Sequence, residues 1–282
     1  MKNFILFLVL ILFTVKMSAQ YLEVGATGGL SSYYGDLQPS APANGSFGVT
    51  YGAFARYNYR PNIAFKVSGL SGKFYATDRY ARNSRRFRNL ESETQYYELA
   101  ATAEWNLTKF DIIDGKTTAP YLFAGVAGFY FNPRGRSDFA TNTWVDLQPL
   151  GTEGQTLPGG KLYSQFQVAI PVGLGMKISI SQKINVGFEA GLRYTFTDYL
   201  DDVSGSYPDL VALKELNPLA FDMSFRTPVA LNRTLDLPSG QKRGDNYKND
   251  IYYYIGGTIS FNIGSREKME FNKSYRNFFN SK

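Results

Sequence analysis

An eight-stranded antiparallel transmembrane β-barrel of the outer-membrane type, with long extracellular loops, is the fold that this sequence predicts. Apolar and polar residues alternate with a period of two in seven segments, an eighth segment is apolar on both faces, and most of the eight are long enough to cross a membrane as tilted strands. Short turns and long polar loops alternate between these segments, which is the layout of such barrels. The apolar faces carry aromatic residues toward both ends, as expected at the two interfaces between lipid and water.

Residues 1–19 have the pattern of a secretory signal peptide. A short basic start, Met1 to Asn3, precedes an apolar run from Phe4 to Val15, and Ala19 is the small residue that a signal peptidase requires. The apolar run is shorter than the ~20 residues of a membrane helix. The sequence therefore predicts cleavage before Gln20 and export of a multi-pass barrel to the cell outer membrane.

The first four predicted strands each have one apolar face. Leu22–Leu30 alternates Leu, Val and Ala with Glu and Thr, and Ser46–Tyr59 carries Phe, Val and Tyr opposite mostly small or polar residues. Ile63–Ser68 follows a tight turn at residues 60–62, and Tyr96–Leu107 alternates aromatic and aliphatic residues with Glu, Thr and Asn. Two unlike faces indicate strands that lie between two different environments.

The last four predicted strands are Tyr121–Phe131, Gln165–Ile180, Asn185–Thr197 and Ile251–Ile263. Three of them show the same alternation of apolar and polar residues. Tyr121–Phe131 is apolar on both faces, so its orientation is predicted only from the aromatic residues at both ends of its odd-numbered register. We expect that register to face lipid.

The connections assign the two ends of the barrel. Turns at 60–62, 108–118 and 181–182 lie at one end, and the long loops 31–45, 74–95, 132–164 and 200–250 lie at the other. This layout places the turns and both termini in the periplasm. We expect residues 20–264 to form the barrel and residues 265–282 a periplasmic tail. In the longest loop, Leu210, Leu213 and Leu216 are spaced for a short helix over the barrel mouth.

A soluble sandwich or a lipocalin-like barrel also has alternating strands, but with the apolar face inward. Here the polar faces are rich in Gly, Ala, Ser and Thr, which suits a crowded lumen better than a solvated surface. Aromatic residues form two predicted girdles on the apolar faces, which favours a membrane barrel. They are Tyr57, Tyr59, Trp105, Tyr121 and Phe261 at the turn end, and Phe47, Phe131, Tyr194, Phe196 and Tyr253 at the loop end.

Charged residues lie in mid-strand on the predicted inward faces, in equal numbers of acids and bases. Toward lipid each would cost several kcal/mol, whereas inside a lumen they can pair. The lumen of an eight-stranded barrel is just wide enough for side chains to fill it. We expect a plug of ion pairs, with a gated ion or solute path as the alternative. The predicted network is Glu23, Arg56, Lys66, Glu98, Glu104, Lys177, Glu189 and Arg193.

Two basic clusters are candidate contacts for lipopolysaccharide or for a protein partner. One loop carries Arg79, Arg82, Arg85, Arg86 and Arg88, and the tail carries Arg266, Lys268, Lys273 and Arg276 among aromatic residues. Arginine side chains can bind phosphate groups with two hydrogen bonds. The alternatives are a solvated loop and a frayed terminus.

The acidic residues Asp198, Asp201, Asp202 and Asp209 carry oxygen ligands of the kind that calcium prefers. Their spacing matches no known calcium loop, so we favour exposed loop acids and expect no metal.

Composition limits the chemistry further. The chain has no cysteine and no histidine, which excludes disulfides, cysteine or histidine metal ligands and histidine-based catalysis. We therefore expect no enzyme activity and no cofactor. The formal net charge of +6 favours an anionic partner, and an exported protein meets lipopolysaccharide rather than nucleic acid.

Three segments resemble the PorG family of Bacteroidetes: EVGATGGLSSYYGDLQPS, TAPYLFAGVAGFYFNP and PVGLGMKISISQKINVGFEAGLRYTFTDYLDDVSGSY, with YTFTDYLDDVSG the most specific part. That family is the outer-membrane barrel component of the type IX secretion system. The resemblance implies a role in secretion and gliding motility, with a periplasmic ring of a lipoprotein and its partner protein as the binding partners. A small porin-like or ligand-binding barrel is the alternative.

Overall fold

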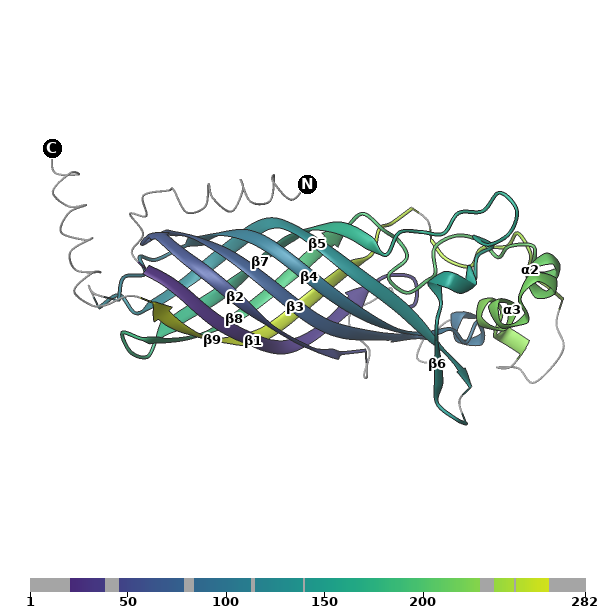
Figure 1. The fold of residues 1–282 in the computed structure, drawn as a ribbon, viewed down its shortest axis with the longest axis horizontal. Helices are drawn as coiled ribbons and strands as arrows, with labels where there is room; N and C mark the ends of the chain where they lie inside the picture. Colours follow the sequence, from purple (N-terminus) through teal and green to yellow (C-terminus); the bar gives the residue numbers. More distant parts are fainter. Residues whose placement is uncertain are drawn as a thin grey trace, which may run out of the picture.

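The computed structural model describes residues 21–38, 46–78, 84–112, 115–138, 140–228, 236–245 and 247–263 (Figure 1). Three groups of predictions concern residues outside this part of the chain. They are the signal peptide with its cleavage site before Gln20, Arg79 and Arg82 of the basic loop, and the whole tail 265–282.

Eight long antiparallel strands close into a barrel. They are β1 (Tyr21–Tyr34), β2 (Gly48–Arg60), β3 (Ile63–Thr77), β4 (Glu91–Asn106), β5 (Thr118–Asp138), β7 (Phe166–Ser179), β8 (Ile184–Thr195) and β9 (Ile251–Ile263). Each strand pairs with the next one in this order, and β9 pairs with β1, so the ring is complete. The predicted fold class and all eight predicted strands are confirmed.

Four strands extend farther at the loop end than the sequence predicts, and β1 is one of them, since it continues past Leu30 to Tyr34. Strand β3 continues past Ser68 to Thr77, β4 begins at Glu91, and β5 runs to Asp138, where it pairs with the short strand β6 (Thr143–Asp146). In the extension of β3, Leu70 and Phe74 are buried inside while Lys73 points outward. The alternation therefore inverts where the barrel leaves the membrane, which is why a search for one apolar face ends too early.

The outer wall is apolar across the membrane-spanning part of the barrel. Val49, Leu99 and Val126 are among its most exposed side chains, each about two thirds accessible. The charged mid-strand residues are buried on the opposite face. This arrangement confirms that the apolar faces point toward lipid and the polar faces toward the lumen.

The predicted orientation of β5 is wrong. Tyr121 and Phe131, which were assigned to the two girdles, are buried in the interior, and the even-numbered residues Leu122 and Val126 face outward. The register explains the reversal, because Phe123 lies directly opposite Glu104 of β4 and must share its inward face.

Inward glycines make room for the aromatic residues of β5. A Cβ added at Gly175 would lie 2.3 Å from the Tyr121 ring, and one added at Gly173 or Gly191 would lie 2.6 Å from the Phe123 ring. The small residues of β7 and of the next strand, β8, therefore complement the large ones of β5 on the inner face of the barrel wall.

The loop end carries the short helices η2 (Ser84–Phe87), η3 (Gln148–Leu150), α2 (Leu210–Leu216) and α3 (Pro218–Ser224). Figure 1 shows α2 and α3 beyond the loop end of the barrel, opposite the end where β1 begins and β9 finishes. The predicted helix over the mouth is confirmed, with Leu210 and Leu213 buried and Leu216 exposed. In the part of the chain that is described, no helix has the length and apolar character needed to cross a membrane.

Candidate functional site

The centre of the lumen is an ion-pair network around Glu104 of β4. Its carboxylate lies 2.6 Å from Nζ of Lys177, 2.9 Å from Nε of Arg56 and 3.7 Å from Nζ of Lys66. These cations come from β7, β2 and β3, so one acid ties together four strands. Lys66 also pairs with Glu189 of β8.

Two further acids complete the network. Glu23 accepts hydrogen bonds from Nη1 of Arg56 at 2.8 Å, from Asn58 at 2.7 Å and from the Ser260 hydroxyl at 3.0 Å. On the loop side, Glu98 pairs with Nε of Arg193 at 3.2 Å and accepts a 2.5 Å hydrogen bond from the Tyr252 hydroxyl. All eight predicted network residues are therefore inside the barrel, and each of them has an oppositely charged partner.

The network fills the lumen rather than lining a path. Side-chain exposure in these pairs does not exceed 6%. Aromatic rings occupy the remaining space, with Nζ of Lys177 4.7 Å from the centroid of Tyr121 and Nζ of Lys66 5.3 Å from that of Phe123. Four acids balance four bases, which makes such burial tolerable because each charge has a partner.

An aromatic layer lies above the network, toward the loops. Tyr33 stacks on Phe74 at 5.0 Å between centroids, and Tyr252 lies 5.2 Å from Tyr96 and 5.4 Å from Phe129. These rings come from β1, β3, β4, β5 and β9 and are almost fully buried. They form a second layer across the barrel.

The turn between β4 and β5 closes the periplasmic end. Phe110 is 1% exposed and packs with Tyr21, Ile112 and Ala119. Its backbone N–H donates to the carbonyl of Pro61 at 2.9 Å, which fixes the turn beneath the lumen. Three stacked layers, namely the Phe110 turn, the charges and the aromatic rings, thus lie between the two ends of the barrel.

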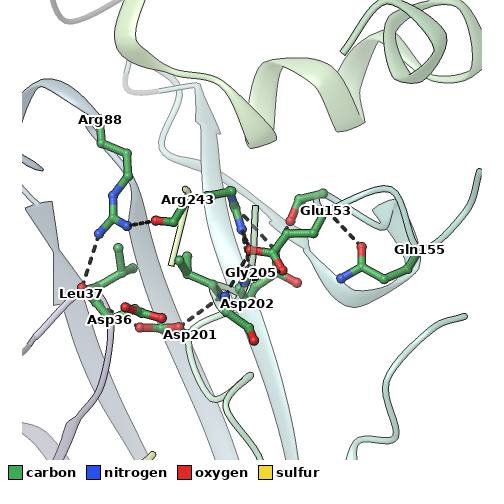
Figure 2. Close-up of polar contacts among 12 residues, drawn as sticks. Asp36, Leu37, Arg88, Glu153, Gln155, Asp201, Asp202, Gly205 and Arg243 are labelled. Atoms are coloured by element: carbon green, nitrogen blue, oxygen red, sulfur yellow. Dashed lines mark hydrogen bonds and ion pairs between the residues drawn. The ribbon is translucent and has the colours of Figure 1, made fainter. Parts of the chain in front are cut away.

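Above the aromatic layer, the loops form an extracellular cap held by two arginines (Figure 2). Arg88 makes two hydrogen bonds to the carboxylate of Asp78, at 2.7 and 2.8 Å, and donates to the backbone carbonyls of Asp36 and Arg243. Arg88 thereby connects three loops. The bidentate pair with Asp78 leaves the Arg88 side chain only 10% exposed, so Arg88 is a structural connector of the cap, and its predicted contact with lipopolysaccharide or a partner stays a prediction.

Arg243 is the second connector of the cap. Its Nη1 donates to Glu153 at 2.9 Å and to the carbonyl of Asp202 at 2.7 Å. Glu153 in turn accepts hydrogen bonds from the backbone N–H groups of Ser204 and Gly205, both at 3.0 Å. Figure 2 shows this side of the cap, with Glu153 between Arg243 and the backbone at Gly205.

The acidic residues after β8 belong to the cap and are buried. Asp201 accepts hydrogen bonds from the Tyr33 hydroxyl at 2.6 Å and from the N–H of Leu37 at 2.9 Å, and Asp202 accepts from Tyr163 at 2.7 Å. The expectation that Asp201 and Asp202 are exposed loop acids is therefore wrong. Asp209 caps the first turn of α2 by accepting from two backbone N–H groups.

Burial sets the protonation of these carboxyl groups. It raises the pKa of Asp201 and of Asp202 to about 6, that of Asp36 to about 7 and that of Asp198 to about 8. Among the described residues, no group of three acidic, histidine or cysteine side chains is arranged to hold a metal ion. The carboxyl groups act instead as acceptors within the cap.

The rest of the basic loop is described only in part. The side chain of Arg86 is exposed, with its guanidinium 4.7 Å from the centroid of Phe87, whereas the side chain of Arg85 lies outside the described part. The sequence alone does not identify four residues on which the cap depends, because each is a single polar residue in a long polar loop. They are Asp36, Asp78, Glu153 and Arg243. Single ion pairs between loop residues, whether near in sequence like Arg88 and Asp78 or distant like Arg243 and Glu153, leave no periodic signal.

Comparison with solved structures finds small membrane barrels. Neisserial surface protein A is 11% identical, with a TM-score of 0.41 over 85% of this chain and 96% of that one. The N-terminal β-barrel domain of OprF from Pseudomonas aeruginosa is 10% identical, with a TM-score of 0.37 over 87% and 99%. Ail, the attachment invasion locus protein of Yersinia pestis, is 7% identical, with a TM-score of 0.38 over 86% and 97%.

Sequence comparison identifies a family. No curated protein matches the chain. One family, described as Domain of unknown function (DUF6089), matches residues 2–146 and 159–224, which is most of the sequence. With its closed ring of eight strands, apolar outer wall and filled lumen, the protein has the fold of an outer-membrane β-barrel, and it belongs to the DUF6089 family.

Proposed function

We propose that this protein is a sealed, non-catalytic barrel that anchors a periplasmic assembly at the outer membrane, as a component of a type IX secretion and gliding apparatus. The observation that carries the anchoring role is the filled lumen. The Phe110 turn, the charge network and the aromatic layer leave the interior occupied by side chains. A barrel of this kind suits a fixed support better than a channel.

Assignment to secretion is supported by the resemblance of three segments to the PorG family. In this proposal the signal peptide is cleaved before Gln20, the cell outer membrane holds the barrel, and the partners are a ring lipoprotein and its partner protein. The periplasmic turns supply a suitable surface. Their described part exposes the bases Arg60, Lys109, Lys116 and Lys183, while Asp111 is buried.

Affinity capture from detergent-solubilised outer membranes, with mass spectrometry of the captured proteins, tests the proposal. Reversing two periplasmic charges, Lys116→Glu with Lys183→Glu, should reduce capture of periplasmic proteins and secretion of cargo, because both side chains are exposed beneath the barrel. Truncation of residues 265–282 tests the tail in the same way. Lys161→Glu, an exposed change at the loop end, is the matched control and should leave capture unchanged.

The alternative barrel classes give a different result. A small porin-like or ligand-binding barrel would show unchanged cargo secretion in these variants and altered solute uptake when the protein is deleted. That combination would contradict the anchoring role.

A further inference from the structure

The extracellular cap contains a pocket of about 710 Å³ that the anchoring role does not use. It lies beside Arg88, Arg243 and Asp36, the residues that join the loops in Figure 2. The volume is within the range of small-molecule sites, which is roughly 300–1,000 Å³. It is too large for a single ion and suits a ligand of several rings.

Three of the residues that line the pocket are aromatic. Tyr207 and Phe225 are both buried and pack edge to face, with centroids 5.9 Å apart and planes at 81°. Phe87 belongs to the same lining and is 38% exposed, so its ring is accessible to a ligand. The exposed ring of Phe87 therefore offers an apolar face to a ligand, and the two buried rings supply further apolar lining.

The lining also has polar residues, and part of its backbone is fixed by hydrogen bonds. It includes Asp236, Gln241 and Lys242, whose side chains are exposed. The N–H of Tyr207 donates to the carbonyl of Gln241 at 2.9 Å, and Ser206 pairs with Lys242 in an antiparallel bridge. The segments around Tyr207 and Gln241 are therefore held together before a ligand binds, which lowers the entropy cost of binding.

Donors and acceptors are mixed in this lining. The guanidinium groups of Arg88 and Arg243 are already paired with Asp78 and Glu153. Lys242 and Asp236 are exposed, and the half-buried carboxyl groups of Asp36 and Asp245 belong to the same lining. The pocket therefore offers hydrogen-bond donors and acceptors, with three cationic side chains and three carboxyl groups in its lining.

We propose that this pocket binds an oligosaccharide. A sugar hydroxyl both donates and accepts hydrogen bonds, so it can satisfy a carboxylate, an amide and an ammonium group in one site. The apolar C–H face of a pyranose ring can lie on the exposed ring of Phe87. A fatty acyl chain would leave the charged groups of this lining desolvated and unpaired, which opposes its binding. The position above the membrane gives access to the polysaccharide of lipopolysaccharide and to free saccharides.

Binding is measured by isothermal titration calorimetry with the purified full-length barrel in detergent. One probe is the polysaccharide released by mild acid from the lipopolysaccharide of the host strain, and the other is maltoheptaose as a free neutral saccharide. Saturable binding of the first alone assigns the ligand to the cell surface, and binding of both assigns a general saccharide site. Either result supports the proposal, and no binding of either probe overturns it.

Variants locate the binding. The double variant Phe87→Ala with Lys242→Ala should weaken binding about tenfold or more, since it removes the accessible ring and the exposed cation. Thr227→Trp, which fills the pocket, should weaken binding without removing either group. The matched control is Tyr247→Ala with Lys248→Ala, an exposed aromatic and an exposed lysine outside the lining.

Heat-modifiable migration in SDS gels verifies that each variant is folded. Equal affinities for the wild type, the pocket variants and the control would place binding elsewhere and overturn the proposal.

Discussion

Replacing Glu104 by Gln should lower the free energy of unfolding by about 3–5 kcal/mol, the usual cost of removing one partner from a buried ion pair. Glutamine keeps the size of the side chain and one acceptor but removes the charge that three cations share. Arg56 retains Glu23 and Lys66 retains Glu189. Lys177 has no other carboxylate within ion-pairing distance among the described residues, so its charge becomes the unpaired one.

Urea titration of the barrel in lipid vesicles, followed by heat-modifiable migration in SDS gels, measures this loss. The control is Asp146→Asn, which breaks the exposed 3.2 Å pair with Arg134 and should cost less than about 1 kcal/mol. Adding Lys177→Met to Glu104→Gln removes the unpaired cation and should recover part of the stability. The account of the network would be refuted if Glu104→Gln lowered the free energy of unfolding no more than the control does. It would also be refuted if the losses from Glu104→Gln and Lys177→Met simply added in the double variant.

Three more predictions concern the two ends of the barrel. The cap should loosen as pH rises: burial raises the pKa of Asp202 from 3.8 to about 6 and that of Asp198 to about 8, so the folded cap holds protons that the unfolded chain has already released. Protection of cap amides from hydrogen exchange, corrected for intrinsic rates, should thus be greatest near pH 4 and fall until about pH 8. Asp202 alone should account for a loss of about 3 kcal/mol in the free energy of cap opening, at ~1.4 kcal/mol per pKa unit. Asp198→Asn should make protection depend less on pH. Arg88→Lys should make the cap loops more sensitive to protease, because lysine cannot reproduce the bidentate pair with Asp78, whereas Arg86→Lys at an exposed position should have no effect. Phe110→Ala should cost about 3–5 kcal/mol in the urea titration by leaving a cavity at the periplasmic end, and a cost below 1 kcal/mol would show that the turn does not seal it.

The sequence predicts the barrel well because two physical constraints repeat along it. Lipid requires one apolar face per strand, and a narrow lumen requires small or paired polar residues on the other. Glu23, Glu104 and Lys177 can therefore be assigned inward from their register alone. Their individual partners cannot, because pairing across the lumen depends on strand tilt and stagger that alternation does not encode.

Strand β5 and the cap show where this reasoning stops. Tyr121 and Phe123 are apolar but face inward, since glycines on β7 and β8 leave space for their rings, and that space is visible only once the strands are in register. In the cap, Arg88 and Asp78 lie close in sequence, whereas Arg243 and Glu153 are far apart. Contacts between distant loops follow from closure of the barrel, which brings the loop ends together.

Current through planar bilayers that contain single wild-type barrels tests the sealed lumen most directly. A variant with an emptied lumen, Arg56→Ala with Glu104→Ala and Lys177→Ala, serves as the positive control for insertion. The account predicts no discrete conductance steps from the wild type and measurable steps from the emptied variant. Reproducible steps from the folded wild-type barrel would contradict it.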